Sequence, residues 1–219
     1  MGYAVLLMIG GTLFVNGLSV LGVADGKGVA VYNIFTGILA TVTPFYLLTQ
    51  VKGADATAFD TVLAVAPMWL FALTFLWVGI NALTGHNPTG VGWYCLWVAF
   101  LAVGFSLVNF IRFDAVPEGI IWLNWAFLWG LFWALLALGQ TRLATFTGWV
   151  AVIQSVWTVT LQAFLAMVGG WADVPDWVFV ALTAVTVALA LVLAARSRPE
   201  EAVVDNRRLA DSHVSVAAP

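Results

Sequence analysis

The chain has 219 residues, of which 63% are hydrophobic and only 9% are charged, and its mean hydropathy is +1.00. Soluble domains carry roughly 25% charged residues, so this composition excludes a water-soluble globular fold and predicts an integral membrane protein. The net charge of −3 comes from too few residues to indicate a nucleic-acid partner, and none is expected. The single cysteine, Cys95, excludes an internal disulfide and any multi-cysteine metal site.

Seven apolar runs are each long enough to cross a bilayer as a helix, which takes about 20 residues. The first run lacks a basic leader, so we expect it to be retained as a helix and not cleaved as a signal peptide. In chain order, the predicted helices are residues 2–23, 29–51, 61–83, 92–110, 117–140, 146–168 and 177–195. Residues 196–219 are polar and predict a disordered cytoplasmic tail. The fold class is therefore all-α, a polytopic membrane helix bundle.

Every charged residue lies in a turn, at the end of a predicted helix or in the tail. Because ionisable groups inside a membrane usually mark ion sites and proton relays, their absence counts against a proton pump and against ion-coupled transport. The same distribution excludes retinal and bis-histidine haem, and no cofactor is expected.

Lysines and arginines number six on one side of the predicted membrane, tail included, and two on the other. By the positive-inside rule, this bias predicts an outside N-terminus and a cytoplasmic C-terminus.

A weak internal repeat joins the second and fifth predicted helices. Gly28 lies five residues before Asn33, and Gly119 lies five residues before Asn124. An inverted repeat of this kind is common in transport proteins and predicts two three-helix halves, residues 1–83 and 92–170. Chance similarity in a biased composition is the alternative interpretation.

Neutral polar side chains are the chemistry that remains inside the membrane. Such groups must bond each other, bond the backbone or line a wet path, because an unpaired amide in hydrocarbon is costly. Hydrogen bonds between helices are the simpler interpretation. Amides also complement a neutral solute that carries a carbonyl and an NH₂ group. The amides are Asn16, Asn33, Asn81, Asn109, Asn124, Gln154 and Gln162.

The helix predicted for residues 117–140 carries a stripe of four tryptophans. Trp122, Trp125, Trp129 and Trp133 are spaced by three, four and four residues, which places them on one helix face. The stripe could serve plain packing or an interfacial belt, although belts lie at helix ends. It could also form a slot between flat indole faces that passes a small planar solute.

Four segments of the chain resemble the AmiS/UreI family of bacterial urea channels and short-chain amide transporters. They are residues 6–17 (LLMIGGTLFVNG), 71–81 (FALTFLWVGIN), 118–129 (EGIIWLNWAFLW) and 146–158 (FTGWVAVIQSVWT). The resemblance implies a six-helix channel core, residues 1–170, plus the seventh C-terminal transmembrane helix as an extension. It also implies a homohexamer in the bacterial inner membrane, passive passage of urea or short-chain amides, and a cytoplasmic amidase or urease that uses them.

The resemblance further implies which residues line the pore. Asn16 matches the family's amide on the first helix, and Gln154 stands where urea channels carry an acidic residue. The remaining expected pore residues are aliphatic and aromatic: Leu6, Leu13, Phe71, Phe75, Trp122, Trp125, Leu128 and Trp129. Trp133, one turn beyond the matched segment, is assigned to packing.

Two departures from the urea channels concern gating. The loop after the second helix is short and lacks histidine, and no histidine is expected on the outer side. Since histidine is the usual group that titrates near neutral pH, we expect no acid gating.

Two functions other than a channel remain as alternatives, a membrane receptor and a structural membrane subunit with a dry tryptophan core. An enzyme is not expected because no nucleophile–base pair is evident.

Overall fold

The computed structural model describes residues 2–53 and 55–197, and the regular structure in these residues is helical. Seven spans are long and apolar enough to cross a membrane, which confirms the predicted all-α class. In chain order, the elements are α1 (Gly2–Val20), α2 (Gly26–Leu48), α3 (Ala56–Val65), α4 (Met68–Thr84), α5 (Thr89–Ile111), α6 (Val116–Leu136), η1 (Thr141–Leu143), α7 (Ala144–Gln154), η2 (Ser155–Leu161), α8 (Gln162–Val168), η3 (Trp171–Asp173) and α9 (Asp176–Ser197).

The third and sixth spans are not single α-helices. Pro67 separates α3 from α4, since proline cannot supply the backbone N–H that would continue the helix. The third span also begins earlier than predicted, because the Asp55 side chain accepts the backbone N–H of Ala58 at 2.9 Å and caps α3. The sixth span contains η2, a seven-residue π-helical segment between α7 and α8. π-Helical segments are rare in proteins, and those that occur often lie at functional sites.

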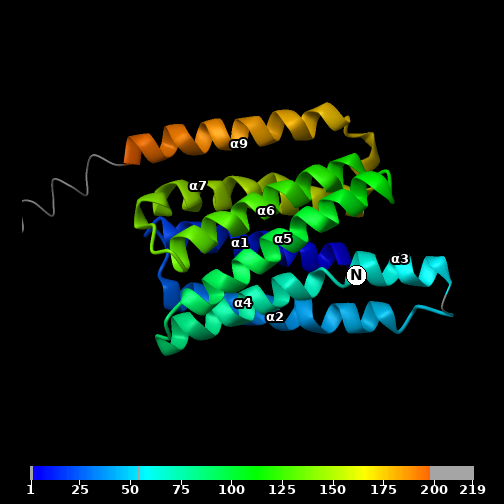
Figure 1. The fold of residues 1–219 in the computed structure, drawn as a ribbon, viewed down its shortest axis with the longest axis horizontal. Helices are drawn as coiled ribbons and strands as arrows, with labels where there is room; N and C mark the ends of the chain where they lie inside the picture. The colour runs from blue at the N-terminus through cyan, green and yellow to red at the C-terminus, as the bar shows by residue number, and fades with distance from the viewer. Residues whose placement is uncertain (1, 54, 198–219) are drawn as a thin grey trace, which may run out of the picture.

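The spans run up and down through one bundle (Figure 1). The connections α1–α2, α4–α5 and α6–α7 lie at one end together with the C-terminal end of α9, and the connections α2–α3, α5–α6 and α8–α9 lie at the other. Two pairs of neighbours pack most closely, α5 with α6 and α2 with α4, while α1 packs against α2, α7, η2 and α8. The division of the channel core into two inverted halves stays a prediction.

Close helix contacts depend on small residues, as is common in membranes. A Cβ added to Gly17 on α1 would lie 2.9 Å from the carbonyl oxygen of Gly148 on α7. The backbones of these two helices therefore touch where neither residue has a side chain.

Helix α9 covers one side of the bundle, against α7 and α6 (Figure 1). Its two threonines face inward. Thr183 accepts a hydrogen bond from the Asn124 side chain at 2.8 Å, and Thr186 accepts one from Trp157 Nε1 at 2.9 Å. The seventh predicted helix therefore packs on the outside of the core, while residues 198–219 of the predicted tail lie outside the described residues.

Candidate functional site

A cavity of about 190 Å³ lies among α1, α4, α5 and α6. A cavity needs only about 10–15 Å³ to hold one water molecule, so this space admits a small solute. It extends from the middle of the bundle toward the end that holds the α1–α2 and α6–α7 connections, because its lining reaches Val20 and Leu136. Its lining residues are Leu13, Asn16, Ser19, Val20, Phe71, Thr74, Phe75, Val78, Val91, Cys95, Trp125, Leu128, Trp129, Phe132 and Leu136.

The cavity wall is apolar on most sides and neutral throughout. Its polar side chains are Asn16 and Ser19 on α1 and Thr74 on α4, with the Cys95 thiol on α5. None of the residues that line it, all within the described ranges, is acidic, basic or histidine. Such a wall can hold an uncharged molecule, whereas a hydrated ion would find too few polar groups to replace its water shell.

Asn16 presents an amide to this cavity from a fixed position. Its Nδ2 donates to Asn33 Oδ1 at 2.9 Å, and Asn33 Nδ2 donates back to Asn16 Oδ1 at 2.6 Å. Asn33 is fully buried, and its Nδ2 also donates to the Val29 carbonyl at 3.0 Å. A primary amide has two N–H donors and an oxygen with two lone pairs. The paired Asn16 therefore keeps one donor and one lone pair for a solute.

Three aromatic rings that line the cavity, those of Phe71, Trp125 and Trp129, pack together with the ring of Trp122, and we call these four residues the aromatic cluster. The Phe71 ring centroid lies 4.9 Å from that of Trp125 and 4.8 Å from that of Trp129. Trp122 lies 4.8 Å from Trp125 and 6.3 Å from Phe71. The rings are tilted or edge-to-face, with interplanar angles of 49° to 83°. Phe71 thus occupies the space between indoles that a flat slot would leave open.

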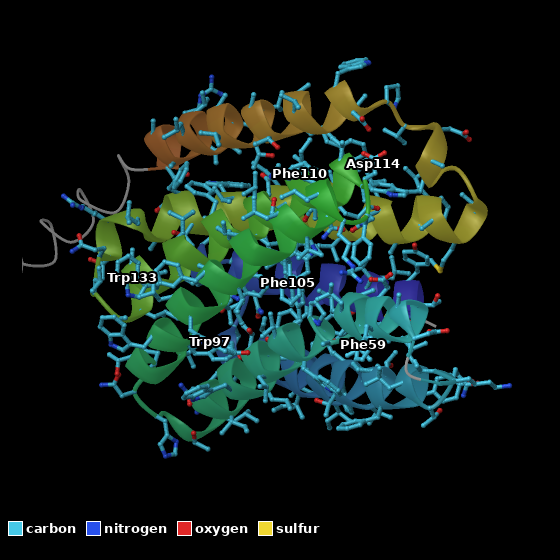
Figure 2. The ribbon with its side chains drawn as sticks, turned by 45° about the vertical axis from the view of Figure 1, so that its right-hand side comes forward. Phe59, Trp97, Phe105, Phe110, Asp114 and Trp133 are labelled. Carbon is cyan, nitrogen blue, oxygen red and sulfur yellow. The ribbon has the colours of Figure 1, made fainter. Side chains whose placement is uncertain are left out.

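Seven of the ten predicted pore residues line the cavity: Leu13, Asn16, Phe71, Phe75, Trp125, Leu128 and Trp129. Leu6 is absent from the lining and lies about two helical turns before Leu13 on α1. Trp122 belongs to the aromatic cluster but is not part of the lining, and its ring lies 5.0 Å from that of Phe105 on α5, which Figure 2 labels. Trp133 packs 6.2 Å from Trp93 on α5 and does not line the cavity.

Gln154 lies elsewhere than expected. It is fully buried on α7 and is not part of the cavity lining. Its Nε2 lies 3.5 Å from Asn124 Oδ1, and Asn124 in turn donates to Thr183 on α9. These side chains join α6, α7 and α9 through hydrogen bonds between helices, which is the simpler of the two interpretations of the intramembrane amides.

Asn33 and Asn124, the two residues of the internal repeat, share a local geometry. Each side chain donates to the carbonyl four residues earlier, Asn33 to Val29 and Asn124 to Ile120, both at 3.0 Å. Each also bonds a second transmembrane helix. The two asparagines are therefore structural links, and Asn16 alone among the intramembrane amides lines the cavity.

Several lining residues were missed by sequence analysis although helical spacing could have found some of them. Phe132 and Leu136 continue the face of Trp125, Leu128 and Trp129 at steps of three and four residues. Val91 and Cys95 could not be found in this way, because only tertiary packing brings α5 to this wall. Within the described residues, no group of three or more His, Cys, Asp or Glu could hold a metal ion.

Comparison with known proteins adds a family and a shared fold. Residues 1–170 match the AmiS/UreI family transporter model. The putative transporter protein AmiS2 of Rhodococcus erythropolis is 42% identical over 175 residues, covering 80% of this chain and 83% of that protein. A putative amidate substrates transporter protein of Mycolicibacterium smegmatis is 38% identical, covering 80% of both. The cryo-EM structure of the Helicobacter pylori urea channel in a closed state superposes with a TM-score of 0.69 at 28% identity, covering 78% of this chain and 100% of the channel.

Proposed function

Because the chain belongs to the AmiS/UreI family of transporters, we propose that it is a passive channel for urea and short-chain aliphatic amides. The observation that carries this proposal is the neutral cavity with one preorganised amide, Asn16, on an otherwise largely apolar wall. A urea or acetamide molecule can exchange an N–H···O and an O···H–N bond with Asn16, as Asn33 already does from the other side. The apolar or planar surface of the solute would then face the aromatic rings and aliphatic side chains of the cavity wall.

Solute selection in this proposal depends on size and neutrality. The path continues from the cavity past the aromatic cluster toward Leu6 at the opposite end of the bundle. Leu13, Phe75 and Leu128 narrow the apolar side of the path, and Phe71 has to move for a solute to pass. Desolvating an ion along such walls without replacing its ligands is costly, which favours uncharged solutes.

The cellular setting forms part of the same proposal. The channel lies in the bacterial inner membrane with its N-terminus outside, and copies of the chain assemble as a homohexamer. The permeant is consumed by a cytoplasmic amidase or urease. Opening does not require acid, since the cavity is lined by no carboxylate or histidine within the part of the chain that the structure describes.

Stopped-flow swelling of proteoliposomes tests the proposal directly. Urea and acetamide should enter faster than in empty liposomes, and glycerol, which lacks the amide pattern, should enter more slowly than acetamide. Absence of amide flux above the empty-liposome rate would refute the channel and favour a structural membrane subunit.

Cys95 allows a second test that locates the path, because it is the single cysteine of the chain and lines the cavity. A small mercurial that reaches the cavity should block flux, and Cys95→Ser should conduct amides without being blocked. Block that persists in Cys95→Ser would place the conducting path elsewhere.

A further inference from the structure

The π-helical segment η2 is joined to two other helices by hydrogen bonds between an indole and a threonine hydroxyl. Trp125 Nε1 on α6 donates to Thr158 Oγ1 in η2 at 3.0 Å, and Trp157 Nε1 in η2 donates to Thr186 Oγ1 on α9 at 2.9 Å. The first bond ends on a ring that lines the cavity, and the second lies outside the cavity. We propose that Thr158 is a positioning residue that fixes the Trp125 indole and thereby sets which amides pass the aromatic cluster. This inference rests on the proposed channel function.

The direction of the hydrogen bonds is fixed by proton counting. The Thr158 hydroxyl has one hydrogen, and it donates this hydrogen to the Gln154 carbonyl at 2.6 Å. The hydroxyl can therefore only accept from Trp125, whose indole nitrogen can only donate. Thr158 is fully buried, so no water replaces it. Rotation of the indole away from this position would leave a buried N–H unpaired, which is unfavourable.

The orientation of Trp125 matters because its neighbours pack edge-to-face on it. Phe71 meets the Trp125 ring at 83° and Trp122 meets it at 81°. Such pairs lose their favourable geometry when one ring turns. Among the described residues of the aromatic cluster, Trp125 is the one whose indole nitrogen donates to another side chain. The cluster is thus tied to the rest of the bundle at this one polar point.

Consecutive residues of η2 contact different helices, because successive side chains of a helix point in different directions. Trp157 points to α9 and Thr158 to α6, so η2 bridges both. Helix α1 supports the segment from a third side, since a Cβ on Gly10 would clash with Thr160 Oγ1. Thr160 Oγ1 donates to the Ser155 carbonyl five residues earlier, which follows the wider π-helical turn. Thr158 is therefore held on a braced segment, as a positioning residue has to be.

The test compares Thr158→Val with Thr158→Ser and with Thr186→Val in the full chain. Valine has nearly the shape of threonine without the hydroxyl, and serine restores the hydroxyl. Thr186→Val is the matched control, since Thr186 also accepts from an indole and donates to the carbonyl four residues earlier. Flux of urea and of butyramide is measured by stopped-flow swelling, with thermal unfolding of each variant.

Thr158→Val should change the butyramide-to-urea permeability ratio by about two- to tenfold, which is the population shift expected when one net hydrogen bond is lost. Thr158→Ser should keep the wild-type ratio. Thr186→Val should lower thermal stability to a similar extent and leave the ratio unchanged. In a Trp125→Phe background, which has no indole N–H, Thr158→Val should cause no further change in the ratio.

Three results would overturn the inference. One is an unchanged ratio in Thr158→Val, or in the smaller Thr158→Ala if the valine variant does not fold. Another is an equal change in Thr186→Val, which would indicate general loosening of the bundle. A further change from Thr158→Val in the Trp125→Phe background would show that Thr158 acts on another group. Wild-type protein that conducts neither solute would instead refute the channel function itself.

Discussion

Replacing Phe71 by leucine tests whether the aromatic cluster closes the path. Phe71 is buried, and its ring lies within 5 Å of two indoles, at 4.9 Å from Trp125 and 4.8 Å from Trp129. Leucine keeps an apolar side chain at this position but removes the aromatic contacts. We expect urea flux through Phe71→Leu to exceed that of the wild type, because the closed arrangement loses part of its stabilisation.

The magnitude follows from the two close ring pairs. Each aromatic pair contributes about 0.5–1.5 kcal/mol beyond the burial of its area, so the two pairs together contribute about 1–3 kcal/mol to the closed arrangement. With tenfold in population for every 1.4 kcal/mol, the ratio of open to closed molecules should rise by about five- to 150-fold. This factor is the upper limit of the increase in urea flux.

Phe75→Leu is the matched control for this substitution. Phe75 lies one turn further along α4 and lines the same cavity, yet its one aromatic neighbour among the described residues is Phe71 at 6.3 Å. Stopped-flow swelling with urea compares the two variants at equal protein density. Equal urea flux in both variants, or lower flux in Phe71→Leu than in the wild type, would refute the closing role of Phe71.

Three further predictions concern the amide, the helix contacts and pH. Asn33→Leu should destabilise the fold by about 1–3 kcal/mol and slow amide flux, because Asn16 loses its partner; unchanged unfolding and flux would contradict this. Gly10→Ala should cost about 1–3 kcal/mol, because its Cβ would meet Thr160, whereas Gly104→Ala, inside helix α5 and with no atom within 4 Å, should be at least as stable as the wild type. Urea flux at about pH 5 and about pH 7.5 should agree, since no histidine among the residues that the structure describes lines the cavity; activation only in acid would contradict it.

The spans could be predicted well because hydropathy alone identifies a helix in a bilayer. The boundaries differ where local chemistry intervenes. Residues 61–83 were predicted as one helix, and the structure begins the span with α3 (Ala56–Val65), breaks it at Pro67 and resumes it with α4 (Met68–Thr84). Both the Asp55 cap and the proline were visible in the sequence. The π-helical segment was not, because its hydrogen-bond shift reflects tertiary contacts and has no simple residue pattern.

The candidate site, like the helices, could be predicted from the sequence only in part. The cavity-lining residues Trp125, Leu128 and Trp129 could be predicted from the resemblance to the AmiS/UreI family, whereas helical spacing alone placed the tryptophans on one face without showing what that face meets. The role of Gln154 could not, since an amide on a buried face can meet either a cavity or a neighbouring helix. It meets Asn124 on α6.

The sequence by itself determined a membrane protein of seven helical spans, with charged residues near the ends of those spans and a row of indoles on one helix face. Those properties depend on composition and on local periodicity, which each segment carries alone. Only the tertiary structure decided that Asn16 lines the cavity while Asn33, Asn124 and Gln154 join helices. It also decided that Phe71 fills the space between the indoles. The physical reason is that a side chain's direction follows from its own helix, whereas what it meets depends on which helices pack beside it.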